Sequence, residues 1–148
     1  MPAGLTYLLL ALIGGVAMAV QAPTNAMLAR ASGSPVLAAL ISFAVGTVAL
    51  IVLLMVTGAP RGLSATRGLP WYAWAGGLYG AFFVAVAAFA APRIGVGALL
   101  TAAVAGQLAA ALILDHFGLL GIEPRPATVT RMLGLLLVFA GALLVRRG

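Results

Sequence analysis

The sequence has little of what a protein needs in order to fold in water. Only 7% of its 148 residues are charged, whereas soluble domains carry roughly 25%. It has no lysine, and its acidic side chains are just two, Asp115 and Glu123. So little polar surface cannot cover a globule in water, which excludes an ordinary soluble domain.

Cysteine is absent altogether. Its absence excludes a disulfide framework and thiol chemistry, and it leaves the redox compartment open. Polar chemistry is equally sparse, because no catalytic constellation is found beyond the neighbouring Asp115 and His116. We therefore expect no enzymatic activity, no cofactor and no bound metal.

Positive charge comes only from arginine, with a formal net charge of +6 and a pI near 11.5. Such a pI is typical of nucleic-acid-binding proteins, whose basic residues gather on one face. Here the arginines are scattered at the ends of apolar runs. We expect them to anchor helices at a membrane surface, and we expect no nucleic-acid partner.

Long apolar runs dominate the chain, which is 64% hydrophobic with a mean hydropathy of +1.22. Runs of about 18 or more apolar residues are typical of transmembrane helices. Four runs reach this length, at 5–28, 35–55, 70–91 and 94–114. A fifth, at about 129–145, reaches it with Arg131 extending its side chain to the membrane surface. Nothing alternates polar and apolar residues as β-barrel strands do, so we predict one all-α membrane domain of five transmembrane helices over residues 1–148.

The first apolar run has one feature of a signal peptide. Ala17-Met18-Ala19 has the small residues of a cleavage site. However, no positively charged segment precedes the run, and the run continues past the supposed cut. We expect this segment to stay in the protein as a helix.

Five spans divide the arginines evenly between the two membrane faces. The face of the N-terminus receives Arg61, Arg67, Arg125 and Arg131. The opposite face receives Arg30, Arg93, Arg146 and Arg147. The arginine and lysine bias of short loops normally sets the orientation of a membrane protein. An even split also arises by chance, but a chain without bias can insert either way, so that two copies of opposite orientation can pair.

The size of the chain favours such pairing. Many secondary transporters place their site between two repeats of inverted topology. We find no internal repeat in 148 residues, and an odd number of helices can supply the inverted half only through a second copy. We therefore predict an antiparallel homodimer, in which this chain is half of a ten-helix inverted-repeat assembly in a lipid bilayer.

Three amide side chains fall inside the predicted spans: Gln21, Asn25 and Gln107. Polar groups in a bilayer cost free energy unless they are paired, and they tend to face a bundle interior or a water-filled cavity. Gln21 and Asn25 share one helix face, and Pro23 between them predicts a kink that frees a backbone carbonyl. We expect the three amides to contact substrate. Hydrogen bonding between helices is the alternative use.

The depth of the amides bears on the dimer. At about 1.5 Å per residue, Gln21 lies roughly 7 Å beyond the middle of its span, and Gln107 lies roughly 4–5 Å past the middle of its own, towards the other face. In an antiparallel dimer, Gln21 of one chain and Gln107 of the other come to similar depth. We predict that the two line one central path.

Asp115-His116 ends the fourth run. A carboxylate beside an imidazole near a membrane surface can take up and release protons, which makes this pair the candidate for coupling transport to protons. The alternative is an anchor at the membrane surface, in contact with Arg125 or Arg131. No acidic residue lies near the middle of a span, which argues against cation exchange on a buried carboxylate.

The third predicted helix opens with Pro70-Trp71-Tyr72-Ala73-Trp74, a pattern typical of an aromatic belt at the headgroup level. Gly76 and Gly80, four residues apart, offer a face for close helix contact. Tyr79 is a further candidate to line a cavity, with core packing as its alternative. Pro92-Arg93 predicts a tight turn into the fourth helix.

Several short motifs together resemble one family. They are QAPTNAML at 21–28, Gly33-Ser34-Pro35, Ser42-Phe43, Gly46-Thr47, Pro70-Trp71, Ala91-Pro92-Arg93, Gly106-Gln107 and Leu114-Asp115-His116-Phe117-Gly118. This combination resembles the YdcZ-type proteins of the drug/metabolite transporter superfamily, over essentially the whole chain. The pairing of Gly106-Gln107 with the segment 114–118 is its most specific part.

The resemblance implies an exporter of four or five helices in the bacterial inner membrane, related to ten-helix transporters with inverted halves. The small multidrug resistance proteins are similar in principle, since their four-helix chains pair antiparallel. Their essential membrane glutamate has no equivalent in this chain, whose first helix offers Gln21 and Asn25 instead.

We therefore predict a small-molecule transporter that works by alternating access as a dual-topology homodimer. A dual-topology dimeric channel and a non-transporting assembly partner of another membrane protein are the alternatives. Amides with aromatics nearby and no buried charge are compatible with small polar neutral or amphipathic substrates.

Overall fold

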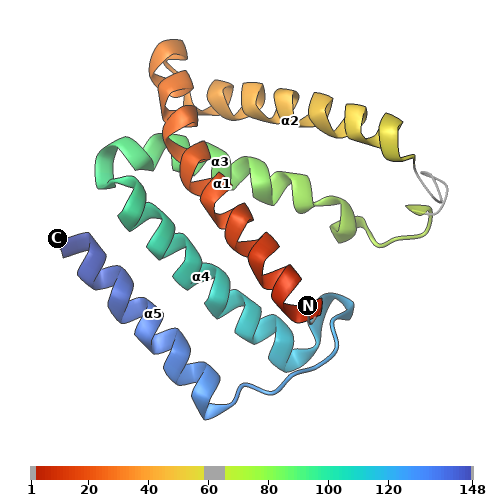
Figure 1. Ribbon diagram of the computed structural model, residues 1–148, viewed down its shortest axis with the longest axis vertical. Coiled ribbons are helices and arrows are strands. Elements are labelled where there is room, and N and C mark those ends of the chain that lie inside the picture. The colour runs from red at the N-terminus through yellow and green to blue at the C-terminus, as the bar shows by residue number, and fades with distance from the viewer. Residues whose placement is uncertain (1–2, 59–65, 148) are drawn as a thin grey trace. The chain divides into compact units, whose positions relative to one another are not determined.

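The computed structural model describes residues 3–58 and 66–147, and Arg61, which enters the charge balance above, lies outside them. The five long helices are α1 (Ala3–Ser32), α2 (Pro35–Thr57), α3 (Gly76–Ile94), α4 (Val96–Phe117) and α5 (Val129–Arg147). All five are long and apolar enough to cross a membrane, and no strand occurs within the described residues. The prediction of an all-α protein with five membrane-spanning helices is confirmed (Figure 1).

The turn between α1 and α2 follows from its three residues. Gly33 adopts a φ of +70°, which an L-residue with a side chain rarely adopts, and so ends α1. The Ser34 hydroxyl accepts a hydrogen bond of 3.2 Å from the Leu37 N–H. Pro35 occupies the first turn, where its missing N–H costs nothing. Gly33-Ser34-Pro35 is thus a helix stop followed by a helix start.

The predicted boundaries of α3 differ from the structure at both ends. The residues after Pro70 form a short 3-10 helix, η2 (Trp71–Trp74), and α3 begins only at Gly76. The predicted turn at Pro92-Arg93 is wrong, because both residues lie inside α3. A proline removes a single backbone N–H and need not end a helix, whereas Gly95, with a φ of +82°, breaks the chain between α3 and α4.

The chain forms two compact units, Met1–Pro92 and Arg93–Gly148. In the first, small side chains from three helices meet: Ala29 of α1, Ala38 of α2 and Ala88 of α3. Phe43 of α2 reaches the backbone of α3 at Gly80, where an added Cβ would lie 3.1 Å from the Phe43 Cζ atom. Small residues allow such close approach of helices in a membrane.

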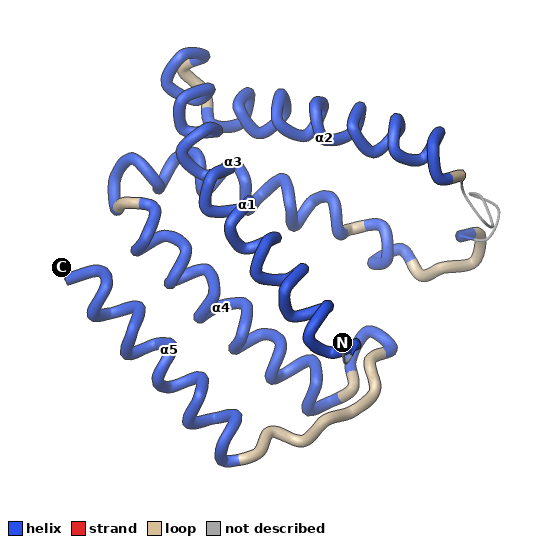
Figure 2. The backbone as a smooth tube through the Cα atoms, viewed as in Figure 1, coloured by secondary structure: helices blue, strands red, loops and turns tan. Residues whose placement is uncertain are grey.

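In the second unit, α4 and α5 lie side by side and are joined by the loop that contains the 3-10 helix η3 (Leu119–Gly121) (Figure 2). Their close approach is seen at Gly97, where an added Cβ would lie 3.6 Å from a methyl group of Val145. Gly118, with a φ of +60°, ends α4 and turns the chain into the loop.

The chain has almost no interior of its own. No large side chain in the described part is fully buried, and α5 has no buried residue. The buried share of each apolar span ranges from 0% for α5 to 22% for α3. Exposed apolar helices of this kind need a bilayer or further helices around them.

Candidate functional site

Asn25 of α1 is the only buried polar or charged side chain among the described residues, with 3% of its surface exposed. It shares the buried face of α1 with Ala22, Ala26 and Ala29, at spacings of three and four residues. Burial of an amide costs free energy unless the amide is hydrogen-bonded. Asn25 is therefore the amide whose placement most requires an explanation.

The Asn25 amide makes no hydrogen bond with another described residue. In the same part of the chain, no fully enclosed side-chain nitrogen or oxygen lacks a partner. The amide atoms must therefore contribute to the small surface that Asn25 keeps exposed. A buried amide with such access can donate and accept hydrogen bonds to a small molecule or to a water.

Gln21 lies one turn before Asn25 and is half-buried. Between them, Pro23 lies inside α1, which continues past it to Ser32, and Figure 1 shows the helix changing direction in this part. The Thr24 hydroxyl donates to the carbonyls of Val20 and Gln21, at 3.2 and 2.8 Å. These are the usual bonds of a helical threonine to carbonyls three and four residues earlier, so the hydroxyl belongs to the helix. The carbonyl that Pro23 leaves without its N–H partner is that of Ala19.

The other two predicted substrate contacts, Gln107 of α4 and Tyr79 of α3, are exposed; 67% of the surface of Tyr79 is accessible. Gln107 belongs to the second unit, whereas Gln21, Asn25 and Tyr79 belong to the first. In the second unit, Gln107 has no other strongly polar side chain within one helical turn on its own face. In the first unit, Gln21 and Asn25 lie one turn apart.

Asp115, near the end of α4, forms an ion pair with Arg131 in the first turn of α5. Arg131 also donates to the backbone carbonyls of Arg125 and Pro126, at 3.2 and 3.4 Å. The Asp115 carbonyl accepts a 2.7 Å hydrogen bond from the Arg125 N–H. Of the two arginines expected near Asp115, Arg131 therefore pairs with its carboxylate, while Arg125 bonds to its backbone.

His116 fixes the other side of the same loop. Its Nδ1 atom accepts a 3.2 Å hydrogen bond from the Ala127 N–H, so Nδ1 carries no proton in this arrangement. The ring also packs edge-on against Phe117, with centroids 4.7 Å apart. Asp115 and His116, the predicted coupling pair, thus hold the α4–α5 loop through two separate contacts. Within the described residues no group of three or more His, Cys, Asp or Glu could hold a metal ion.

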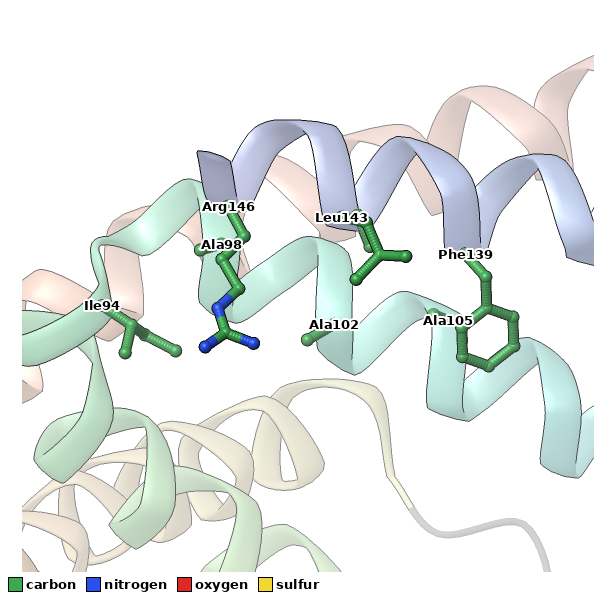
Figure 3. A pocket seen from close by; sticks show the side chains of 8 residues that line it. Ile94, Ala98, Ala102, Ala105, Phe139, Leu143 and Arg146 are labelled. Carbon is green, nitrogen blue, oxygen red and sulfur yellow. The ribbon is translucent and has the colours of Figure 1, made fainter. Parts of the chain in front are cut away.

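Sequence reasoning missed a groove between α4 and α5, with a volume of about 320 Å³. One wall comes from Ile94, the last residue of α3, and from Ala98, Ala102 and Ala105 of α4. The other comes from α5: Phe139, Ala142, Leu143 and Arg146. Figure 3 shows the Arg146 guanidinium reaching from α5 towards α4 at one end of this groove. Ala98 and Ala102, four residues apart, are the sequence signal at this groove, and small residues at that spacing favour close helix contact rather than a groove.

One comparison with known proteins found a match. The model of the family described as "Putative inner membrane exporter, YdcZ" matches residues 6–144, nearly the whole chain. No curated protein and no solved structure matches the chain. The chain therefore belongs to the YdcZ family, as a multi-pass protein of the inner membrane, and the family points to transport rather than catalysis.

Proposed function

We propose that this member of the YdcZ family exports a small molecule by alternating access, as an antiparallel homodimer of dual topology. The observation that carries the proposal is the lack of interior in one chain. With only 0–22% of each described span buried, a single copy leaves most of the surface of its helices to be covered by lipid or by further helices. A second, inverted copy would supply the other half of a cavity.

In this proposal Asn25 and Gln21 contact the substrate from α1, and Gln107 of the opposite copy contacts it at similar depth. Tyr79 lies on the wall of the cavity that the two copies form. Support comes from the burial of Asn25 without a hydrogen bond to another described residue. Asp115 and His116 remain the candidates for coupling. Their contacts with Arg131 and the Ala127 N–H mean that a coupled proton would have to open the α4–α5 loop.

The topology test uses the even arginine split. A C-terminal reporter that is active on one membrane side only should give signal on both sides for the natural chain. Arg67→Gln and Arg30→Gln each remove one charge, from opposite faces, so they should shift the reporter ratio in opposite directions. A single orientation that neither substitution alters would overturn the homodimer.

Pairing is tested by crosslinking, for which the absence of cysteine is convenient. Copies with Gln21→Cys and copies with Gln107→Cys, carrying different tags, should crosslink between chains. A pair of Gln21→Cys with Thr101→Cys is the matched control, because Thr101 lies as far from the middle of the 94–114 span as Gln107, on the other side. Crosslinks of residues 21 and 107 found only within one chain would refute the shared path.

Transport itself is tested in liposomes with small polar neutral and amphipathic molecules. Saturable uptake that accelerates when the same molecule is present on the far side indicates a carrier. Flux that rises linearly with concentration and shows no such acceleration indicates a channel. No flux by the purified protein would favour an assembly role.

A further inference from the structure

The α4–α5 groove has a charged end and an apolar body. Arg146 provides its only charged lining residue, and the rest are alanine, leucine, isoleucine and phenylalanine. The Arg146 guanidinium has no ion pair or hydrogen bond with another described residue. An unpaired guanidinium at the end of an apolar groove complements a ligand with an anionic head and an apolar tail.

Two other grooves of the same helix pair show what is distinctive about this one. They have similar volumes, about 340 and 360 Å³. The first is lined by Arg131, which is already paired with Asp115, and the second is lined by no charged residue. Size therefore does not separate the three grooves, whereas an available positive charge does.

The groove runs in the same direction as the acyl chains of a lipid. Its α5 wall follows one face of the helix from Phe139 to Arg146, about 10 Å along the axis. Because α5 spans the membrane, this axis runs roughly with the acyl chains. Arg146 lies in the last turn of α5, at the level where phosphate headgroups lie. Basic pockets between transmembrane helices bind anionic headgroups for this reason.

We propose that this groove binds an anionic phospholipid, with one acyl chain along Ala98, Ala102 and Leu143 and the headgroup phosphate on Arg146. The site is independent of the substrate that the protein exports. In an antiparallel dimer the two copies would hold one such lipid in each leaflet. The protein would then be stabilised by phosphatidylglycerol beyond what a zwitterionic lipid provides.

The experiment measures phosphatidylglycerol retained by the purified protein in detergent, by native mass spectrometry and by the rise in melting temperature, against phosphatidylcholine of the same acyl chains. Arg146→Gln should weaken phosphatidylglycerol binding about ten-fold, the factor that corresponds to roughly 1.5 kcal/mol for a hydrogen bond to a charged group. Arg147→Gln is the matched control, because Arg147 carries the same charge one residue later and does not line the groove. It should leave binding unchanged.

A second variant tests the apolar body. Ala102→Phe places a ring in the groove and should displace the lipid, whereas Ala110→Phe, on the same helix outside the groove, should not. Equal losses for the two arginine variants would overturn the proposal in favour of general surface charge. Equal retention of both lipids would overturn the role of Arg146. An Ala102→Phe variant that keeps its lipid but loses its dimer would show that a second copy covers the groove instead.

Discussion

Asp115 and Arg131 form an ion pair that joins the end of α4 to the start of α5, and Arg131 uses the same guanidinium to bind two carbonyls of the loop between them. The side chains are partly exposed, 24% for Asp115 and 37% for Arg131. The motif that suggested proton chemistry thus has a definite structural use. Its contribution can be separated from any role in transport by measurements on the resting protein.

Removing either partner should destabilise the second unit, and the losses should not add. We expect a coupling free energy of about 0.5–1 kcal/mol in the cycle of Asp115→Asn, Arg131→Gln and the double variant, since exposed pairs contribute little. Arg131→Gln should cost more than Asp115→Asn, because it also removes two hydrogen bonds to the loop. Chemical unfolding in micelles measures this, and strictly additive losses would contradict the ion pair.

His116 should be replaceable by asparagine but not by glutamine. The Oδ1 atom of Asn can take the place of Nδ1 and accept from the Ala127 N–H, whereas the Gln carbonyl lies too far along the side chain. Because one such hydrogen bond contributes about 0.5–1.5 kcal/mol, His116→Gln should speed hydrogen exchange of the Ala127 amide roughly three- to ten-fold. His116→Asn should exchange as the natural chain does. Equal acceleration in both variants would argue against Nδ1 as the acceptor.

Gly118 should tolerate no side chain. Its φ is +60°, and a Cβ there would lie 2.6 Å from the Pro124 Cγ atom. We expect Gly118→Ala to lower stability by about 1–3 kcal/mol, through both strain and overlap. Gly134→Ala is the control, because Gly134 lies in α5 with nothing within 4 Å of its added Cβ. It should be neutral or stabilise by up to about 1 kcal/mol, as measured by thermal unfolding in detergent.

The two glycines of α3 should behave differently although they form one sequence motif. An added Cβ at Gly80 meets the Phe43 ring at 3.1 Å, and one at Gly76 meets nothing within 4 Å. Gly80→Ala should therefore cost about 1 kcal/mol, and Gly76→Ala should not. Replacing the Phe43 ring by the shorter side chain of leucine, in Phe43→Leu, should recover part of the lost stability. Equal sensitivity of both glycines would point to a contact that runs along the whole face.

Replacing Asn25 with leucine should raise stability. Leucine has nearly the shape of asparagine and removes a largely buried amide that lacks a hydrogen bond to another described residue, so we expect a gain of about 0.5–2 kcal/mol. An amide that holds helices together would give a loss instead. The sign of the change in melting temperature therefore separates a substrate contact from a structural one, and Gln21→Leu serves as the half-buried comparison.

The helices could be predicted from the sequence because their causes are local. Backbone groups in a bilayer must be satisfied within the helix, so a long apolar run bounded by Gly33-Ser34-Pro35 or by Gly118 already defines a span and its end. The errors were local as well. The predicted turn lay at Pro92, whereas Gly95 makes it, and the predicted third helix included the residues of η2.

The contacts of the polar side chains could not be predicted in the same way, because they depend on distances between residues that are far apart in the sequence. The sequence offers Arg125 and Arg131 equally as partners for Asp115, and only the packing of α4 against α5 brings the Arg131 guanidinium to the carboxylate. The same packing leaves Arg146 beside an apolar groove while Arg147 stays outside it.

Composition and the apolar runs by themselves determined that this chain lies in a membrane as five helices. Tertiary structure decided what the few polar groups do. Gln21, Asn25 and Gln107 carry the same amide chemistry in the sequence, yet only Asn25 is buried. Hydropathy acts residue by residue, whereas burial depends on which helix faces meet, and that is why one amide among three is buried.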